Sequence, residues 1–441
     1  MIQSQPREIH FGVFAANFGL SSAGWLAAAV GLLLNTNVLS DHYYSSVAIL
    51  LVHTFTLLTI SPCILAVLFQ LLPVVVGGTL ASRPGGWILS ILWWLGAGGF
   101  LICRWQKPGW LVWFAGLLVL AISGLIVLVA FTIRRGHWNA RALQVMAALG
   151  WLLIMALSGS LMAWGGQTWF LPLQLLHWHA WTGILAWFSL MIVALGSQLL
   201  PMFLLSHNLR ESLAHVSALL LGLCPVALFA GRALPGSLSQ FPVLIVGGLA
   251  LGLFLAFLLQ CFRHRMRKRL ESGMTMFLLS FLFPVLAWAL AAAESVGLEG
   301  KLFSPSHRWD TALVLLMLPG FVGGATMGMS LKVLPFMSWM ALQTRMDSAT
   351  SVPEQSSGPA RSAKSRVSSR SAASTLLPRD MAPGILSKIL LWTYPPSILF
   401  LAAGLLASPL LYPGLLLFLV SAILNAFHFL WTISTAIRSH V

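Results

Sequence analysis

Charged residues are scarce in this chain of 441 amino acids. Only 8% of the residues are Asp, Glu, Lys or Arg, whereas 58% are hydrophobic and the mean hydropathy is +0.89. Because a soluble domain carries about 25% charged residues, this chain lacks the side chains to cover a water-facing surface. The composition excludes an ordinary soluble protein and indicates that lipid surrounds most of the molecule.

Cysteine and tyrosine are also rare, with four of each. The cysteines form no CxxC pair, and they lie within or at the ends of apolar segments, at Cys63, Cys103, Cys224 and Cys261. This pattern is not that of a disulfide framework or a cysteine-ligated zinc site.

Long apolar runs dominate instead. Twelve of them reach the length of about 20 residues that a helix needs to cross a bilayer. They lie near 9–34, 46–76, 86–104, 109–132, 142–165, 177–205, 213–232, 241–262, 273–296, 309–339, 386–407 and 413–437. No cleavage signal precedes the first run, so we expect it to be retained as a span. The sequence predicts an all-α polytopic membrane protein with twelve transmembrane helices.

Lys and Arg are distributed unevenly between the two ends of these helices. Nineteen of the 25 lie at the termini or in the even-numbered loops, and five lie in the odd-numbered loops. The positive-inside rule then predicts cytoplasmic N- and C-termini in a multi-pass protein of the bacterial inner membrane. We attribute the net charge of +15 to this topology and to an anionic cytoplasmic leaflet, and we expect no nucleic-acid partner.

One segment departs from the apolar pattern. Residues 343–385 are rich in Ser, Ala, Arg and Pro, and they predict a disordered basic cytoplasmic loop. This loop separates helices 1–10, in residues 1–342, from helices 11–12, in residues 386–441, within one membrane domain.

A short motif recurs along the chain. QLLP ends the apolar runs at 70–73 and 198–201, and KVLP ends a third at 332–335, so the motifs are spaced by 128 and 134 residues. They fall on the second, sixth and tenth spans, which is every fourth helix. Leu-Leu-Pro is common in membrane proteins, but this placement predicts a threefold repeat, with three pseudo-symmetric arcs of four helices.

Histidines accompany two of these prolines. His53 lies twenty residues before Pro73, and His177 and His179 lie 24 and 22 residues before Pro201. Imidazole is the usual axial ligand of haem and a common ligand of copper, so these helices predict a haem or copper site in the outer half of the bundle. A hydrogen bond to a neighbouring carbonyl is an alternative role for His53.

The spacing of His177 and His179 places their rings on different faces of one helix. We expect the deeper His179 to face the bundle axis. Trp178 and Trp181 surround both, so an interfacial aromatic belt is the alternative interpretation. Deeper in the last span, His428 follows Asn425 on one helical face and is either a second polar site or a helix-packing residue.

Three stretches resemble the catalytic subunit of haem–copper oxidases, and more closely its short divergent relatives that include the NnrS-type haem proteins of nitric oxide metabolism. They are HTFTLLTISPCILAVLFQLLPVVVGG, HWHAWTGILAWFSLMIVALGSQLLPMF and GFVGGATMGMSLKVLPFMSW. The resemblance implies twelve helices in three arcs of four. It also implies that His53 is the helix 2 ligand of a low-spin haem, and that His177 or His179 is the helix 6 ligand of copper.

The chain departs from the oxidase pattern on helix 10, where Leu313 and Leu315 replace two histidines. We therefore expect a haem- and/or copper-binding membrane protein without the full oxygen-reducing centre, acting in respiratory electron transfer or in binding nitric oxide or another small gas. An enzymatic activity, if present, would be of terminal oxidase or nitric oxide reductase type. The implied partners are an electron donor or other subunits of a respiratory complex.

Two other functions remain open. A transporter on the same scaffold would use Gln70, Gln198 and Lys332, which occupy matching positions in the three motifs, as polar lining, although helix-end capping also explains them. A structural or assembly subunit would need no cofactor. The glycines of GFVGG, at 320–324, admit either a flat macrocycle or a closely packed helix.

Overall fold

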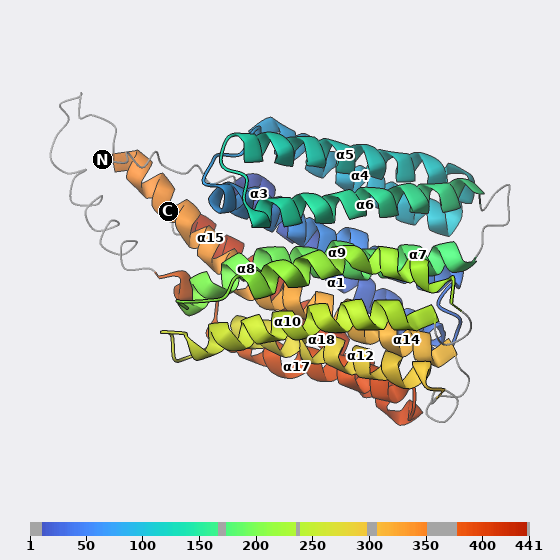
Figure 1. Ribbon diagram of the computed structural model, residues 1–441. Helices are drawn as coiled ribbons and strands as arrows, with labels where there is room; N and C mark the ends of the chain where they lie inside the picture. The colour runs from blue at the N-terminus through green and yellow to red at the C-terminus, as the bar shows by residue number, and fades with distance from the viewer. Residues whose placement is uncertain (1–10, 166–172, 235–238, 298–306, 351–376, 439–441) are drawn as a thin grey trace, which may run out of the picture.

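The computed structural model describes residues 11–165, 173–234, 239–297, 307–350 and 377–438. In these ranges the chain forms helices and turns but no β-strand (Figure 1). Twelve helices are long and apolar enough to cross a membrane, so the twelve predicted spans are confirmed.

Nine spans are single helices or pairs of helices, and three are interrupted by a π-helical segment. In chain order they are α1 (Phe11–Leu34); α2 (Ser46–His53), π-helix Thr54–Ile60 and α3 (Ser61–Val76); α4 (Arg83–Gln106); α5 (Leu111–Arg134); α6 (Ala140–Gly165); α7 (Leu173–Thr182), π-helix Gly183–Ser189 and α8 (Leu190–Leu204); α9 (Ser212–Gly231); α10 (Phe241–Arg263); α11 (Ser272–Ser280) with α12 (Leu282–Ser295); α14 (His307–Leu315), π-helix Leu316–Gly323 and α15 (Gly324–Thr350); α17 (Gly384–Gly404); and α18 (Leu411–Arg438).

The segment predicted as a loop, 343–385, begins within a helix. Helix α15 continues to Thr350 and extends beyond the other helices (Figure 1), past the predicted apolar run 309–339 and into this segment. Residues 343–350 contain good helix formers and no proline, so the helix propagates out of the bundle. At the other side of the loop, Pro378–Asp380 forms a short 3₁₀ turn, and residues 351–376 lie outside the described ranges.

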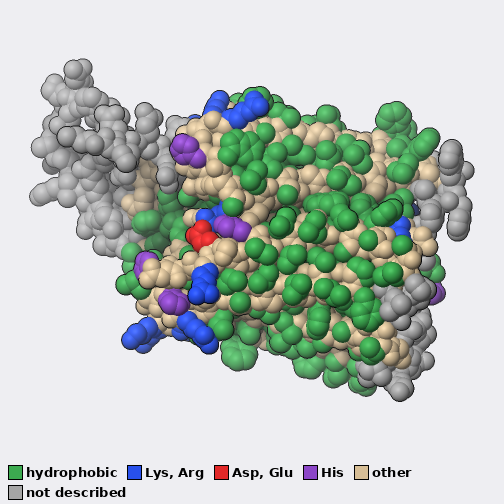
Figure 2. All heavy atoms as spheres, viewed as in Figure 1, with side chains coloured by type: hydrophobic (Ala, Val, Ile, Leu, Met, Phe, Trp, Pro, Cys, Tyr) green, Lys and Arg blue, Asp and Glu red, His purple; other side chains and the backbone are tan. Residues whose placement is uncertain are grey.

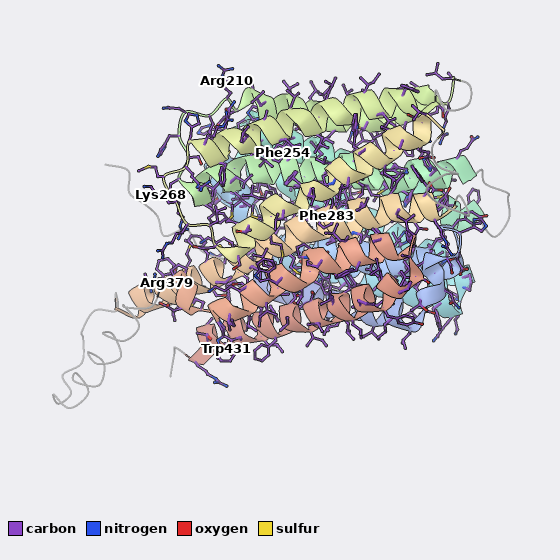
Figure 3. All side chains as sticks on the ribbon, turned by 90° about the horizontal axis from the view of Figure 1, so that it is seen from below. Arg210, Phe254, Lys268, Phe283, Arg379 and Trp431 are labelled. Carbon is purple, nitrogen blue, oxygen red and sulfur yellow. The ribbon has the colours of Figure 1, made fainter. Side chains whose placement is uncertain are left out.

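One end of the bundle carries most of the described Lys and Arg side chains (Figure 2). Arg210, Lys268 and Arg379 project there, as Figure 3 shows. We call this the basic end, and the end formed by the first residues of α2, α7 and α14 the opposite end.

The second, sixth and tenth spans form the centre of the bundle. In their most apolar windows 78%, 89% and 89% of the residues are buried within the protein, against 22–44% in the other nine spans. The helices that carry the QLLP and KVLP motifs are therefore the ones around which the rest pack.

The three π-helical segments lie in the first half of these central spans, after helices of 8, 10 and 9 residues. A π-helix leaves main-chain groups without their usual α-helical partners, and inside a membrane these must be satisfied by the protein. Side chains from the surrounding helices do this: Trp93 Nε1 donates to the Leu57 carbonyl at 2.9 Å, and the Tyr394 hydroxyl donates to the Pro319 carbonyl. The outer helices thus hold the irregular backbone in place.

An aromatic cluster fills the space between the second and tenth spans on the side of α1, α17 and α18. The Trp25 ring meets Phe55, Tyr394 and Phe418 edge-on, with ring centroids 5.0, 5.3 and 6.0 Å apart. A Cβ atom at Gly323 would collide with Tyr394 and lie 3.0 Å from Phe55. Of the two roles considered for GFVGG, close packing is therefore the one observed.

Candidate functional site

His53 is the last residue of α2, immediately before the first π-helical segment. Its Nδ1 lies 2.7 Å from the carbonyl oxygen of Ile49. A carbonyl only accepts hydrogen bonds, so Nδ1 carries a hydrogen, and in the neutral ring the lone pair therefore lies on Nε2. The carbonyl bond considered for His53 from the sequence is present, and it is also the bond that an imidazole makes when Nε2 ligates a metal.

His179 is held in the same tautomer by α6. Its Nδ1 lies 3.1 Å from the Met155 carbonyl and 3.0 Å from Ser158 Oγ. Because the Ser158 hydroxyl donates its own hydrogen to Met155 O at 2.7 Å, both contacts accept from Nδ1–H. The lone pair of His179 is therefore on Nε2 as well.

The structure brings these two imidazoles together. The ring centroids of His53 and His179 are 6.3 Å apart, and the ring planes differ by 24°. The Phe100 ring packs on His53 at 5.0 Å, and both histidines keep a minor part of their surface accessible. The sequence alone did not show that the second and sixth spans bring these two residues next to each other.

One cation lies beside the pair. Arg104, on α4, donates from Nη2 to the Ser46 hydroxyl at the start of α2 and is close enough for its charge to act on His53. In the described part of the chain, no group of three or more His, Cys, Asp or Glu side chains is placed to share a metal ion. The site thus consists of two imidazoles, with the guanidinium of Arg104 near His53.

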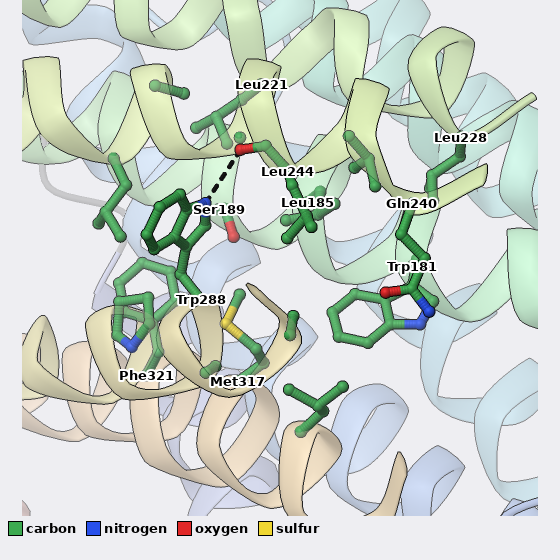
Figure 4. A pocket seen from close by; sticks show the side chains of 18 of the residues that line it. Trp181, Leu185, Ser189, Leu221, Leu228, Gln240, Leu244, Trp288, Met317 and Phe321 are labelled. Atoms are coloured by element: carbon green, nitrogen blue, oxygen red, sulfur yellow. Dashed lines mark hydrogen bonds between the residues drawn. The ribbon is translucent and has the colours of Figure 1, made fainter. Parts of the chain in front are cut away.

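His177 faces a different space. It lines a large cavity and lies 6.2 Å from Trp181, measured between ring centroids. The expectation that His177 and His179 face different sides is therefore confirmed. The cavity has a volume of about 490 Å³ and lies between the sixth to tenth spans. Figure 4 shows Trp181, Gln240 and Met317 among the side chains around it.

Among the side chains of the tenth span that the structure describes, no imidazole reaches either place. Leu313 and Leu315 are buried, and Leu313 lines the large cavity. His307 begins α14, but its side chain lies outside the described part. In the loop before α2, the His42 ring stacks on Tyr44 at 4.9 Å.

The other polar candidates lie away from the histidine pair. His428 and Asn425 are 3% and 7% exposed and border a void of about 10 Å³, which is the space of one water molecule. Lys332, with a side chain that is 13% exposed, forms an ion pair with Glu271. The Nε2 atom of Gln70 is buried without a hydrogen-bond partner.

Neither a protein-family model nor a curated protein matches this chain.

The sequence predicted His53 and His179 as site residues but not the groups that surround them. The π-helical segments, the carbonyl of Met155 and the serine at Ser158 carry no recognisable motif. The cavity was also missed, because its walls come from five spans and consist mostly of ordinary apolar residues.

Proposed function

We propose that this protein binds a copper ion between His53 and His179 and uses it in respiratory electron transfer or in binding nitric oxide or a related small gas. The observation that carries the proposal is the neighbouring pair of nearly parallel imidazoles, each with Nδ1 bonded to a main-chain carbonyl. Copper bound there would supply one-electron redox chemistry and a coordination site for a small molecule.

The spacing of the rings supports a shared ion. Two imidazoles bound on opposite sides of one metal, each at about 2.0 Å, have ring centres roughly 6 Å apart, and the observed separation is 6.3 Å. The hydrogen bonds to carbonyls orient the rings and raise their basicity as ligands. Neutral ligands, few polar neighbours and the nearby Arg104 charge all favour a singly charged ion, so we propose Cu(I) as the resting form.

Haem, the other expected cofactor, fits poorly beside His53. The resemblance implies a low-spin haem between the second and tenth spans, but Leu315 offers no ligand, and the Trp25 cluster fills the adjoining space. We therefore propose copper rather than haem at this site.

The scaffold also supports a relationship to the haem–copper oxidases. The QLLP, QLLP and KVLP prolines follow the first residues of their π-helical segments by 19, 18 and 19 residues, and all three spans are central. We propose that they are equivalent helices of a threefold repeat of four-helix arcs. We further propose that the basic end is cytoplasmic, as in a bacterial inner-membrane protein.

Metal analysis tests the proposal. We expect about one copper ion per chain in protein purified from copper-supplied cells, and the same amount in His177→Ala, whose ring lies on the other face of the helix. His53→Ala and His179→Ala should each lose nearly all of it, because a single imidazole cannot hold the ion. Full copper in both variants, or a loss only in His177→Ala, would contradict the assignment.

A further inference from the structure

Two loops at the basic end are joined to each other through their main chains. They are the loop after α8, residues 205–211, and the loop after α10, residues 264–271. A single antiparallel β-bridge connects Ser206 with Arg265, and the Ser206 hydroxyl donates to the Cys261 carbonyl at 2.7 Å. We call this unit the paired loops. Their surface is held in one shape rather than formed by two independent segments.

The paired loops carry more positive charge than their carboxylates neutralise. They contain two carboxylates, and both are engaged: Glu211 pairs with Arg141 at 2.9 Å, and Glu271 pairs with both Arg267 and Lys332. Four further cations on the loops and at the end of α10 have exposed side chains and no carboxylate partner within the described ranges: Arg210, Arg263, Lys268 and Arg269. Arg210 and Lys268 are labelled at this end in Figure 3. This surface therefore attracts anions.

Two large apolar side chains are exposed on the same surface. Leu205 is 53% exposed and Met266 is 66% exposed. They belong to the two joined segments, since Met266 N donates to the Leu205 carbonyl at 3.3 Å. Both lie just beyond the ends of their spans, at Leu204 and Arg263, which is the level at which a helix leaves the hydrocarbon of the membrane. At this level lipid chains cover apolar groups.

The backbone at Leu205 is in a conformation that favours glycine. Its φ is 53° and its ψ is 49°, in the left-handed region, and it caps α8. A side chain makes this conformation costly, and glycine is the usual residue there. The matching position of the first QLLP motif, four residues after Pro73 instead of Pro201, is indeed Gly77, with a φ of 65°. A strained leucine with half its surface exposed is explained if its side chain has a partner outside the protein.

We propose that the paired loops bind an anionic phospholipid, with its phosphate held by the unpaired cations and an acyl chain against Leu205 and Met266. A soluble anion would satisfy the cations alone, and a zwitterionic lipid would cover the apolar pair without neutralising the charge. An anionic phospholipid matches both features. With the basic end cytoplasmic, as proposed above, this lipid belongs to the inner leaflet. The proposal does not depend on copper, because the paired loops share no residue with the histidine pair.

Two double variants separate this site from the general charge of the basic end. Lys268→Gln with Arg269→Gln removes two of the unpaired cations. Arg134→Gln with Arg135→Gln removes the same charge from another loop, where both side chains are also exposed. Only the first pair lies on the paired loops, so only that pair should change a lipid site located there.

Leu205→Gly separates lipid contact from a structural role. Glycine relieves the left-handed backbone, so the unfolding midpoint of the protein should not fall. The variant also removes the apolar side chain, so its affinity for the lipid should fall several-fold. A purely structural role for Leu205 predicts the reverse, a lower midpoint and an unchanged affinity.

Native mass spectrometry of the full-length protein in detergent, titrated with phosphatidylglycerol, counts the bound lipids and measures their affinity. We expect one tightly bound phosphatidylglycerol per chain, and at least tenfold weaker binding of phosphatidylcholine with the same acyl chains. Lys268→Gln with Arg269→Gln should weaken the binding of phosphatidylglycerol roughly 25-fold, about fivefold for each cation removed. Arg134→Gln with Arg135→Gln should leave it unchanged. Inorganic phosphate, which lacks acyl chains, should not compete.

Four results would overturn the proposal. The first is equal weakening in both double variants, since the overall charge would then explain the binding. The second is equal affinity for phosphatidylglycerol and phosphatidylcholine. The third is displacement of the lipid by inorganic phosphate, which would assign the paired loops to a free anion. The fourth is displacement by a soluble hexaglutamate peptide, which would assign them to an acidic protein partner.

Discussion

Replacing Gly323 with Ala should destabilise the protein, because the tenth span has no room for a methyl group at this position. The added Cβ would collide with the Tyr394 hydroxyl and lie 3.0 Å from Phe55 and 3.1 Å from Trp25. All three rings are buried, and Trp25 contacts both of the others, so none can move away freely.

The expected change in the free energy of unfolding combines two costs and one gain. Overpacking of this kind costs about 1–3 kcal/mol. Displacing Tyr394 also weakens its hydrogen bond to the Pro319 carbonyl, which adds about 1 kcal/mol. Alanine recovers up to about 1 kcal/mol through its higher helix propensity. The control Gly150→Ala has nothing within 4 Å of its Cβ and should show only this gain. The two variants should therefore differ by about 2–4 kcal/mol.

Equilibrium unfolding in mixed micelles, followed by tryptophan fluorescence, measures this difference. Equal stability of Gly323→Ala and Gly150→Ala would refute the reasoning. It would mean that the aromatic cluster leaves space between the second and tenth spans, and haem beside His53 would become reasonable again.

Three further predictions concern single contacts. Tyr394→Phe should cost about 1–3 kcal/mol in the same unfolding assay, since it leaves a main-chain carbonyl of a π-helical segment unsatisfied; an unchanged midpoint would contradict that role. Glu271→Gln should cost about 1–2 kcal/mol, because it leaves the mostly buried Lys332 ammonium without its partner, whereas Lys332→Met combined with Glu271→Gln should recover part of the loss. Burial, the Asp310 carboxylate and Tyr44 raise the pKa of Tyr43, in the loop before α2, above its ordinary value of about 10. The folded state then holds this proton more tightly, so stability should fall as the pH rises above about 10, and Asp310→Asn should lower the Tyr43 pKa in an ultraviolet titration.

The membrane architecture could be predicted from the sequence because its signals are local. A run of about 20 apolar residues specifies a spanning helix without reference to the rest of the fold. The predicted helix 46–76 coincides with Ser46–Val76, although it contains a π-helical segment that no apolar pattern revealed. The end of α15 was missed because a polar helix and a polar loop have similar compositions.

The candidate site was only partly predictable. His53 and His179 were selected as polar groups in apolar helices, and the spacing of His177 and His179 correctly separated their faces. His53 meets the sixth span rather than the tenth because of how the helices pack, and no short pattern in the sequence encodes that packing. The Met155 carbonyl is a main-chain group and has no sequence signature at all.

The most direct test of the copper assignment is X-ray absorption at the copper edge on copper-loaded protein. We expect a Cu(I) edge and extended fine structure with two imidazole nitrogens at about 2.0 Å. In His179→Ala the signal of the second imidazole should disappear. A spectrum without imidazole scattering, or one that His179→Ala leaves unchanged, would contradict the central claim that His53 and His179 hold one metal ion between them.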